Sequence, residues 1–428
     1  MYILGVNLSH HASVCLLKNG KVLFYLEDDR LSRDKEISFD VRDGDGPESK
    51  LNSKLLSLEK VSQYTNHIDH IIFASYGRRI DAKKWPHDND DVLIEYILNK
   101  VKFSYDSVHC LREHHLYHAF NAFYSSGFKE AAALVLDAGG MSLDGYGYEN
   151  GPENIDFIET KFAALEPLYR EAETMYHFDA KGDFECIFKH YTSSQLRYMG
   201  RNKPFSTTQD VFLSSSMSCG VLFNDITYIL EALGEQGEVP SWRPSAAGKT
   251  MGLSSYGDAE NPLLKPATNP HALGRWFIED KKTGVWVTNN SVILTLLYNH
   301  YPRFYSLLKR SYTGGEIVDP TKYFPLDEKT FQQAADLSKK LQVETKNHAV
   351  RLIQQLLNRT RTNNIVLSGG YFLNCVNNYE YIKEFPGVNF YIDPIAYDGG
   401  TAMGAARYVW HHILKKTKRY PLDSLFLG

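Results

Sequence analysis

The stretch YILGVNLSHHASVCLLKNGKVLFYLE, residues 2–27, decides how the fold of this chain begins. It contains three apolar segments, at residues 2–8, 13–18 and 21–27. Asn19-Gly20 separates the last two, and this dipeptide tolerates the positive φ angles that a two-residue hairpin turn requires. The sequence therefore predicts a three-stranded β-meander at the N-terminus.

Helix and strand patterns alternate along the rest of the chain. Strands are predicted at residues 68–74, 108–111, 131–136, 364–367 and 389–392, with residues 146–148 and 155–162 as neighbours of the strand at 131–136. Helices are predicted at residues 51–64, 91–101, 113–124 and 327–358, and after the glycines that follow the last two strands. Strand–Gly-Gly–helix units indicate parallel strands in α/β layers. Because both halves begin with apolar strands, we expect a duplicated α/β lobe.

Length and composition limit the class of protein. A chain of 428 residues exceeds the usual size of a single core, so at least two packed lobes are expected. The 47 basic and 51 acidic residues give a net charge of −4, which disfavours a strongly electrostatic nucleic-acid binder. Five scattered cysteines favour a reducing compartment over a disulfide framework. With no apolar run of about 18 residues and no leader segment, we expect a cytoplasmic protein without a membrane anchor.

A histidine pair is the first candidate for chemistry. His114 and His118 are four residues apart, so they share one face of the predicted helix and have a sound geometry for holding one metal ion. No other pair among the 16 histidines has this spacing. The alternative is two helical histidines that pack at an interface between lobes.

Three glycine turns at strand ends form the second candidate: Asp137-Ala138-Gly139-Gly140, Ser368-Gly369-Gly370 and Asp398-Gly399-Gly400. Glycine allows the backbone to approach phosphate oxygens, and a following helix N-terminus presents unpaired N–H groups. Each turn alone is most often only a tight turn, but the three together favour a nucleotide cleft between lobes. The two aspartates could complete the metal site or hold Mg²⁺ through water.

Two polar segments are weaker candidates. Gly248-Lys249-Thr250 does not belong to a P-loop, because Arg243 stands where the motif requires its first glycine. A lysine in such a glycine-rich loop can still contact phosphate as a point charge, and the alternative is a polar surface loop. The turn at residues 9–13 and the charged run at residues 28–35 are otherwise ordinary polar surface.

The order of these pieces is more informative than any one of them. Together with Leu367-Ser368-Gly369-Gly370…Leu373-Asn374-Cys375 and the segment from Asp398 to Ala406, the motifs quoted above occur in the order seen in NodU/CmcH-type O-carbamoyltransferases. The chain resembles that family from end to end, with a variable middle. The first domain of that family is similar to the tRNA-threonylcarbamoylating subunit.

The resemblance implies a fold of two actin-like lobes of the RNase H-like, ASKHA type. The first lobe would span residues 1–130 and the second residues 131–428, with a mostly helical insertion at about residues 165–325. Residues 421–428 resemble the family's interdomain linker, so the C-terminal domain that forms carbamoyl-adenylate is expected to be absent. Three explanations stay open: a separate subunit supplies this donor, the sequence is a truncated form, or this variant works without the domain.

The chemistry implied is transfer of a carbamoyl group from carbamoyl-adenylate, made from carbamoyl phosphate and ATP, to a hydroxyl. The acceptor would be a small molecule, a sugar or, in nucleic acid, a hydroxymethylated base. The resemblance places iron, or another divalent transition metal, on His114, His118, Asp137 and Asp398. It assigns catalysis to His10 and Lys35. The residues expected to bind ATP or AMP are Gly139, Gly140, Lys249, Gly369, Gly370 and Asn374.

The sequence departs from the family at three places. Ala247-Gly248-Lys249 replaces Glu-Gly-Lys, Ser254-Ser255-Tyr256-Gly257 replaces Ala-Pro-Tyr-Gly, and Glu36 replaces a histidine. Two other functions stay open, namely a regulatory subunit that senses nucleotide and a sugar-kinase-like phosphotransferase. Intact candidate ligands disfavour the first, and the histidine pair disfavours the second because kinases hold Mg²⁺ on carboxylates.

Overall fold

The structure is a computed structural model of the chain. It describes residues 1–33, 56–75, 90–111, 113–141, 169–193, 205–206, 210–234, 247–265, 274–300 and 328–425. Lys35 and the strands expected at residues 146–148 and 155–162 lie outside the described residues.

The first sheet has five strands in the order β3-β2-β1-β4-β5. Their bounds are β1 (Tyr2–Asn7), β2 (Ser13–Lys18), β3 (Lys21–Glu27), β4 (His67–Ala74) and β5 (Ser104–Leu111). The first three form the predicted antiparallel meander, and Asn19 and Gly20 have the positive φ angles that its turn requires. β4 and β5 continue the sheet parallel to β1. β5 begins four residues earlier than expected, because its exposed first half lacks an apolar signal.

The second sheet has seven strands in the order β14-β13-β6-β7-β8-β10-β9. Their bounds are β6 (Ala131–Leu136), β7 (Tyr169–Phe178), β8 (Phe184–Ser193), β9 (Phe205–Ser206), β10 (Val211–Ser214), β13 (Asn364–Ser368) and β14 (Asn389–Ile392). β6, β7 and β8 form an antiparallel meander, and β13 and β14 run parallel to β6. Five strands of this sheet therefore repeat the order and directions of the first sheet.

This repeat is that of two RNase H-like lobes in an actin-like fold, so the predicted α/β fold class is confirmed. We call the part built on the first sheet the first lobe and the part built on the second sheet the second lobe. The division of the chain at residue 130 stays a prediction.

Ten α-helices lie within the described residues. Their bounds are α1 (Asp28–Ser32), α3 (Leu56–Val61), α4 (Asp90–Lys100), α5 (His114–Ser126), α7 (Cys219–Gly234), α8 (Ala247–Leu253), α9 (Asn290–His300), α11 (Glu328–Thr360), α12 (Cys375–Glu384) and α13 (Thr401–Tyr408). In the part of the chain that the structure describes, no helix is both long and apolar enough to cross a membrane.

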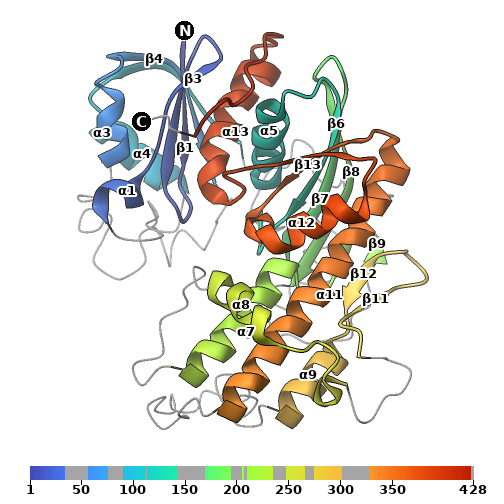
Figure 1. The fold of residues 1–428 in the computed structure, drawn as a ribbon. Coiled ribbons are helices and arrows are strands. Elements are labelled where there is room, and N and C mark those ends of the chain that lie inside the picture. Colours follow the sequence, from blue (N-terminus) through green and yellow to red (C-terminus); the bar gives the residue numbers. More distant parts are fainter. Residues whose placement is uncertain are drawn as a thin grey trace.

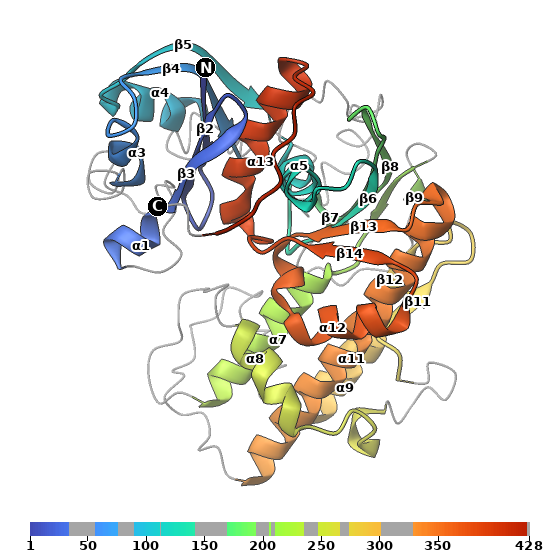
Figure 2. The same cartoon turned by 45° about the horizontal axis from the view of Figure 1, so that its top comes forward.

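Two helices, α5 and α13, lie side by side between the two sheets (Figure 1). α13 packs on the first sheet and α5 on the second, and apolar residues of both sheets and both helices form one core. α3 and α4 cover the outer face of the first sheet, and α11 covers that of the second (Figure 2). The order of layers is therefore helix, sheet, helix pair, sheet, helix.

Glycines allow the close packing of the central layer. A Cβ at Gly5 of β1 would lie 1.9 Å from the carbonyl oxygen of Ala402 in α13. A Cβ at Gly404 of α13 would lie 1.9 Å from the carbonyl oxygen of Tyr117 in α5. Any side chain at either position would separate α13 from its neighbour, so these contacts fix the helix between the lobes.

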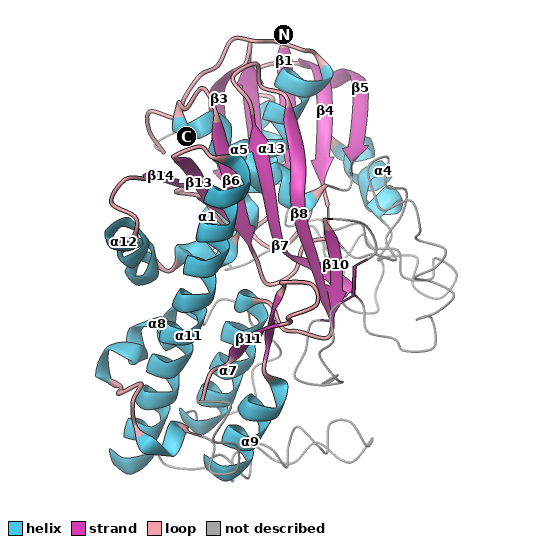
Figure 3. Cartoon of the chain, turned by 90° about the vertical axis from the view of Figure 1, so that its right-hand side faces the viewer, coloured by secondary structure: helices cyan, strands magenta, loops and turns pink. Residues whose placement is uncertain are grey.

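The segment expected as a mostly helical insertion, residues 165–325, also supplies strands of the second sheet. β7 and β8 lie at its beginning, and their place beside β6 corrects the expected pairing with residues 146–148 and 155–162. β7 is buried on both faces, so it lacks the alternation that marks a half-buried strand. The helices of this segment, α7, α8 and α9, pack with α11 below the sheet (Figure 3).

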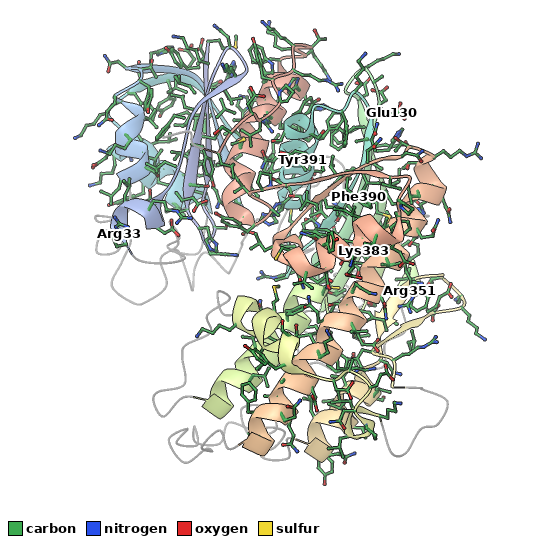
Figure 4. All side chains as sticks on the ribbon, viewed as in Figure 1. Arg33, Glu130, Arg351, Lys383, Phe390 and Tyr391 are labelled. Atoms are coloured by element: carbon green, nitrogen blue, oxygen red, sulfur yellow. The ribbon has the colours of Figure 1, made fainter. Side chains whose placement is uncertain are left out.

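A small hairpin is also attached to α11. Its strands are β11 (Phe277–Glu279) and β12 (Trp286–Thr288). Arg351 of α11, labelled in Figure 4, lies over the ring of Trp286 at 4.0 Å from its centroid. This cation–π contact fastens the hairpin to the long helix.

A buried charged network joins α11 to the second sheet. Oε1 of Glu173 in β7 lies 2.5 Å from Nε2 of His348, and Oε2 lies 3.2 Å from Nδ1 of His190. Nε2 of His190 in turn lies 2.7 Å from the hydroxyl of Ser214. All four residues are buried. Burial alone would raise the pKa of Glu173, but the two histidines outweigh it and lower this pKa to about 2.

We predict that Glu173→Gln lowers stability at neutral pH by about 3 kcal/mol, because it breaks a buried ion pair. The folded-state pKa is below the ordinary value of 4.5, so this contribution is present above pH 4.5 and is lost as the pH falls toward 2. The thermal unfolding midpoint of Glu173→Gln should therefore be lower than that of the wild type at pH 7. The difference between the two midpoints should become smaller as the pH falls toward 2. Glu185→Gln, on the exposed part of β8, is the matched control. An unchanged midpoint in Glu173→Gln at pH 7 would contradict this prediction.

Candidate metal centre

Four side chains from three parts of the chain converge at one end of the central helical layer. His114 and His118 lie in the first two turns of α5, Asp137 directly follows β6, and Asp398 begins a short 3₁₀ turn before α13. One nitrogen or oxygen atom of each lies within 4.8 Å of the others, and all four residues are buried. The fold thus brings together the four residues expected to bind a metal, although their role as ligands stays a prediction.

The distances among these groups are close to those of ligands around a single ion. Nε2 of His114 lies 3.2 Å from Nε2 of His118 and 3.3 Å from Oδ2 of Asp137. Oδ1 of Asp398 lies 3.5 Å from Nε2 of His114 and 3.8 Å from Nε2 of His118. Two ligand atoms at about 2.0–2.2 Å from one ion are separated by about 2.9–3.6 Å in octahedral or tetrahedral geometry. Only small movements would close this cluster around one ion.

The two carboxylates and the imidazole of His114 stabilise one another's charged forms. Burial would lower the pKa of His114, but Asp398 and Asp137 outweigh it and raise that pKa to about 10. Burial would likewise raise the pKa of both aspartates. Instead, His114 lowers the pKa of Asp137 to about 2, and His10 with His114 lowers that of Asp398 well below its ordinary value. Two buried ionised carboxylates thus create a place where positive charge is strongly favoured.

The donor set fits a divalent transition metal. It offers two imidazole nitrogens and two carboxylate oxygens, which suit iron, manganese or zinc better than calcium. Nδ1 of His118 is buried and has no hydrogen-bond partner among the described residues, whereas Nε2 of the same ring faces the cluster. His115, between the two histidines, contacts Thr174 through Nδ1 at 2.7 Å instead.

Asp398 connects the cluster to His10 of the first lobe. Its Oδ1 faces His114 and His118, whereas its Oδ2 lies 3.5 Å from Nδ1 of His10. Oδ2 also accepts a hydrogen bond of 2.8 Å from the hydroxyl of Ser9. The side chain of His10 is 29% exposed, whereas that of Asp398 is 2% exposed, so His10 lies on the accessible side of the cluster.

Two glycine turns adjoin the cluster because β6 and β13 are neighbours in the sheet. The backbone N–H of Gly370 donates to Oδ1 of Asp137 at 3.2 Å. Gly369 has a φ of 96°, and a Cβ there would lie 2.2 Å from the carbonyl oxygen of Leu136. Gly139 and Gly140 follow Asp137, and a Cβ at Gly140 would lie 2.6 Å from the His115 ring. Nucleotide binding by these turns stays a prediction.

The other predicted site residues lie elsewhere. Lys249 is exposed on α8, so the Gly-Lys-Thr segment expected as a loop is a helix, packed against α7 and α11. Asn374 is buried at the start of α12, where its side chain caps the helix and exchanges hydrogen bonds with Gln342. Lys35 lies outside the described residues. Roles for these three residues in catalysis or nucleotide binding stay predictions.

Four residues of this region were not among the predicted site residues: Ser9, Ser13, Glu27 and Tyr397. Ser9 and Ser13 donate hydrogen bonds of 2.8 Å to the side chain of Asp398 and the carbonyl of Gly399. The hydroxyl of Tyr397 donates to Glu27. Ser9 and Ser13 belong to a polar turn that the sequence made visible, but no local pattern pairs it with residues almost 390 positions away.

Solved structures with a similar course of the chain include two of HypF. Full-length HypF in the phosphate- and nucleotide-bound form is 13% identical, with a TM-score of 0.48, over 95% of this chain and 55% of that chain. HypF of T. kodakarensis is 12% identical, with a TM-score of 0.47, over 95% of this chain and 48% of that chain.

The chain is also similar in sequence to a curated protein and to a family model. An uncharacterized protein of Synechocystis sp., sll1178, is 22% identical over 440 residues, which cover 97% of this chain and 58% of the relative. The chain thus spans little more than half the length of this curated relative. A family model described as the carbamoyltransferase N-terminus matches residues 50–407. The chain therefore belongs to the carbamoyltransferase family.

Proposed function

We propose that this chain is the transferase part of an O-carbamoyltransferase. It would transfer a carbamoyl group from carbamoyl-adenylate to a hydroxyl of a small molecule, a sugar or a hydroxymethylated nucleobase. Family membership supports the transferred group. The observation that carries the proposal is the cluster of His114, His118, Asp137 and Asp398, which reaches His10 through Asp398.

In this proposal His10 would act as the general base. Its Nδ1 faces Oδ2 of Asp398 at 3.5 Å, which favours the tautomer with the proton on Nδ1 and directs Nε2 to the opposite side of the ring. There Nε2 would accept the proton of the acceptor hydroxyl. The hydroxyl oxygen forms a bond to the carbamoyl carbon, the bond from that carbon to the AMP phosphate oxygen breaks, and AMP leaves with the electron pair.

The surrounding residues would bind and orient the donor. A divalent cation, iron by family resemblance, would polarise the carbamoyl carbonyl or acidify the acceptor hydroxyl. Backbone N–H groups of the turns at Gly139-Gly140 and Gly369-Gly370 would hold the adenylate phosphate, because glycine permits close approach. Asp398 would fix the position of His10 relative to the histidine pair, since it contacts both.

The donor and the cellular setting are further parts of this proposal. Carbamoyl-adenylate would come from carbamoyl phosphate and ATP on a separate adenylate-forming partner or domain. The five cysteines are scattered along the chain and form no Cys-x-x-Cys motif, which fits a reducing compartment such as the cytoplasm.

The test is carbamoyl transfer from a supplied donor. Purified protein loaded with Fe²⁺ under argon should release AMP from synthetic carbamoyl-adenylate and form a carbamate ester on one of a panel of polyols, amino sugars and 5-hydroxymethylated nucleosides. Chromatography would quantify AMP, and mass spectrometry would identify the ester, with a reaction lacking acceptor as the control for hydrolysis. AMP release without an ester on any acceptor, or phosphorylation of a sugar by ATP, would contradict the proposal.

A further inference from the structure

Glu27 is a buried carboxylate that joins the two lobes beside the candidate metal centre. It ends β3 of the first lobe and is 4% exposed. Its Oε1 accepts hydrogen bonds from the hydroxyl of Tyr25, at 2.8 Å, and from that of Tyr397. Tyr25 lies on the same strand as Glu27, whereas Tyr397 belongs to the second lobe and directly precedes Asp398. A single oxygen atom therefore holds one residue of each lobe.

The turn that follows Tyr397 fits closely against this carboxylate. Gly399 has no side chain, and a Cβ there would lie 3.1 Å from Oε1 of Glu27 and 2.8 Å from the Tyr25 hydroxyl. Ser9 and Ser13 hold the next two residues of the turn through the side chain of Asp398 and the carbonyl of Gly399. The first lobe thus contacts three consecutive residues of the turn, and the middle one is a candidate metal ligand.

The buried carboxylate of Glu27 favours the arrangement in which the turn at Tyr397 lies against the first lobe. A carboxylate that leaves water must be hydrogen-bonded or paired, because its desolvation is otherwise very costly. Oε2 of Glu27 lies 3.5 Å from Nε of Arg30, whose side chain is 69% exposed. The closer contacts are the two tyrosine hydroxyls on Oε1, and one of them comes from the second lobe. Oε1 of Glu27 therefore keeps both of its hydrogen bonds only while the turn at Tyr397 lies against the first lobe.

We propose that Glu27 is a positioning residue for the metal centre. Through the hydroxyl of Tyr397 it holds the turn at residues 397–399, so that Oδ1 of Asp398 faces the histidine pair and Oδ2 faces His10. This inference rests on the proposed metal centre and adds that the centre is complete only when the first lobe holds its ligand turn. Glu27 itself is not one of the four candidate ligands.

Co²⁺ is a suitable probe, because its visible d–d absorption reports the geometry and number of its ligands. Groups that orient metal ligands typically contribute about 10–100-fold to metal affinity. We expect Glu27→Gln and Tyr397→Phe each to weaken Co²⁺ binding by about 10-fold or more and to shift the d–d bands. Tyr25→Phe is the matched control, because it removes the other hydroxyl on the same oxygen and leaves the turn connected.

The outcomes separate this inference from the proposed function. Weaker Co²⁺ binding in Tyr397→Phe with near-wild-type Co²⁺ binding in Tyr25→Phe supports the positioning role of Glu27. Equal losses of Co²⁺ affinity in both variants would mean that Glu27 only stabilises the fold, and would overturn the inference. Wild-type affinity and spectrum in Glu27→Gln also overturn it, while leaving the metal centre intact. If Glu27→Gln fails to fold, as circular dichroism would show, the two tyrosine variants decide. A wild-type chain that binds no Co²⁺ overturns the metal centre and the inference together.

Discussion

Replacing both His114 and His118 with alanine should leave the protein without a tightly bound transition metal, whereas the wild type should carry about one ion per chain. These histidines supply two of the four converging ligand atoms, and Asp137 and Asp398 alone would hold a transition metal only weakly. Elemental analysis after anaerobic loading and gel filtration would measure the ion. The rate of carbamoyl transfer should fall by about 10²–10⁴-fold, which corresponds to the loss of several kcal/mol of charge stabilisation that a bound cation would supply.

A second histidine pair provides the control for this experiment. His70 of β4 and His109 of β5 have ring nitrogens 3.3 Å apart, almost as close as those of His114 and His118. Within the described part of the chain they belong to no group of potential metal ligands, so alanine at both positions should leave the tightly bound ion in place. Because the His114 variant leaves two buried carboxylates without their counter-charge, His118→Gln tests the same point with less risk to folding. Equal metal content in wild type and the His114/His118 variant would end the metal hypothesis.

The fold could be predicted where local signals are strong. Asn19-Gly20 indicates its hairpin directly, and the strands β6 and β14 have the bounds that their apolar runs predict. β7 was missed because a strand buried on both faces lacks alternation. Charged and histidine residues of β7 and β8 also pair inside the protein, as His190 does with Glu173. Recognition of such strands needs the neighbouring strands, which the sequence alone does not place.

The same distinction holds for the site. The spacing of His114 and His118 on one helix, and the position of Asp137 and Asp398 after strands, are local features that a sequence shows. The contacts of Glu27 with Tyr397 and of Ser9 with Asp398 depend on how the two lobes pack. A glutamate at a strand end has no pattern of its own, so this second layer of the site could not be predicted.

Substituting His10 with alanine should lower the rate of carbamoyl transfer by about 10²–10⁴-fold, the usual contribution of a general base. The metal should stay bound, because His10 is not one of the four residues of the cluster and faces Oδ2 of Asp398, whereas Oδ1 of Asp398 faces the histidine pair. The measurements are the single-turnover rate with carbamoyl-adenylate and the Co²⁺ spectrum of the same preparation. His177→Ala, on β7 near Glu130, removes a partly exposed imidazole away from the site and should change neither.

The transfer rate and the Co²⁺ spectrum together distinguish two roles for His10, namely a general base and a residue that only positions Asp398. If His10 only held Asp398 in place, alanine would shift the Co²⁺ bands and weaken metal binding, as Ser9→Ala should do by removing its 2.8 Å hydrogen bond to the same oxygen. If His10 accepts the hydroxyl proton, the rate falls while the spectrum stays that of the wild type. His10→Gln would sharpen the contrast, because an amide can still donate to Asp398 but cannot take up a proton at neutral pH. A rate near wild type in His10→Gln would therefore exclude His10 as the base.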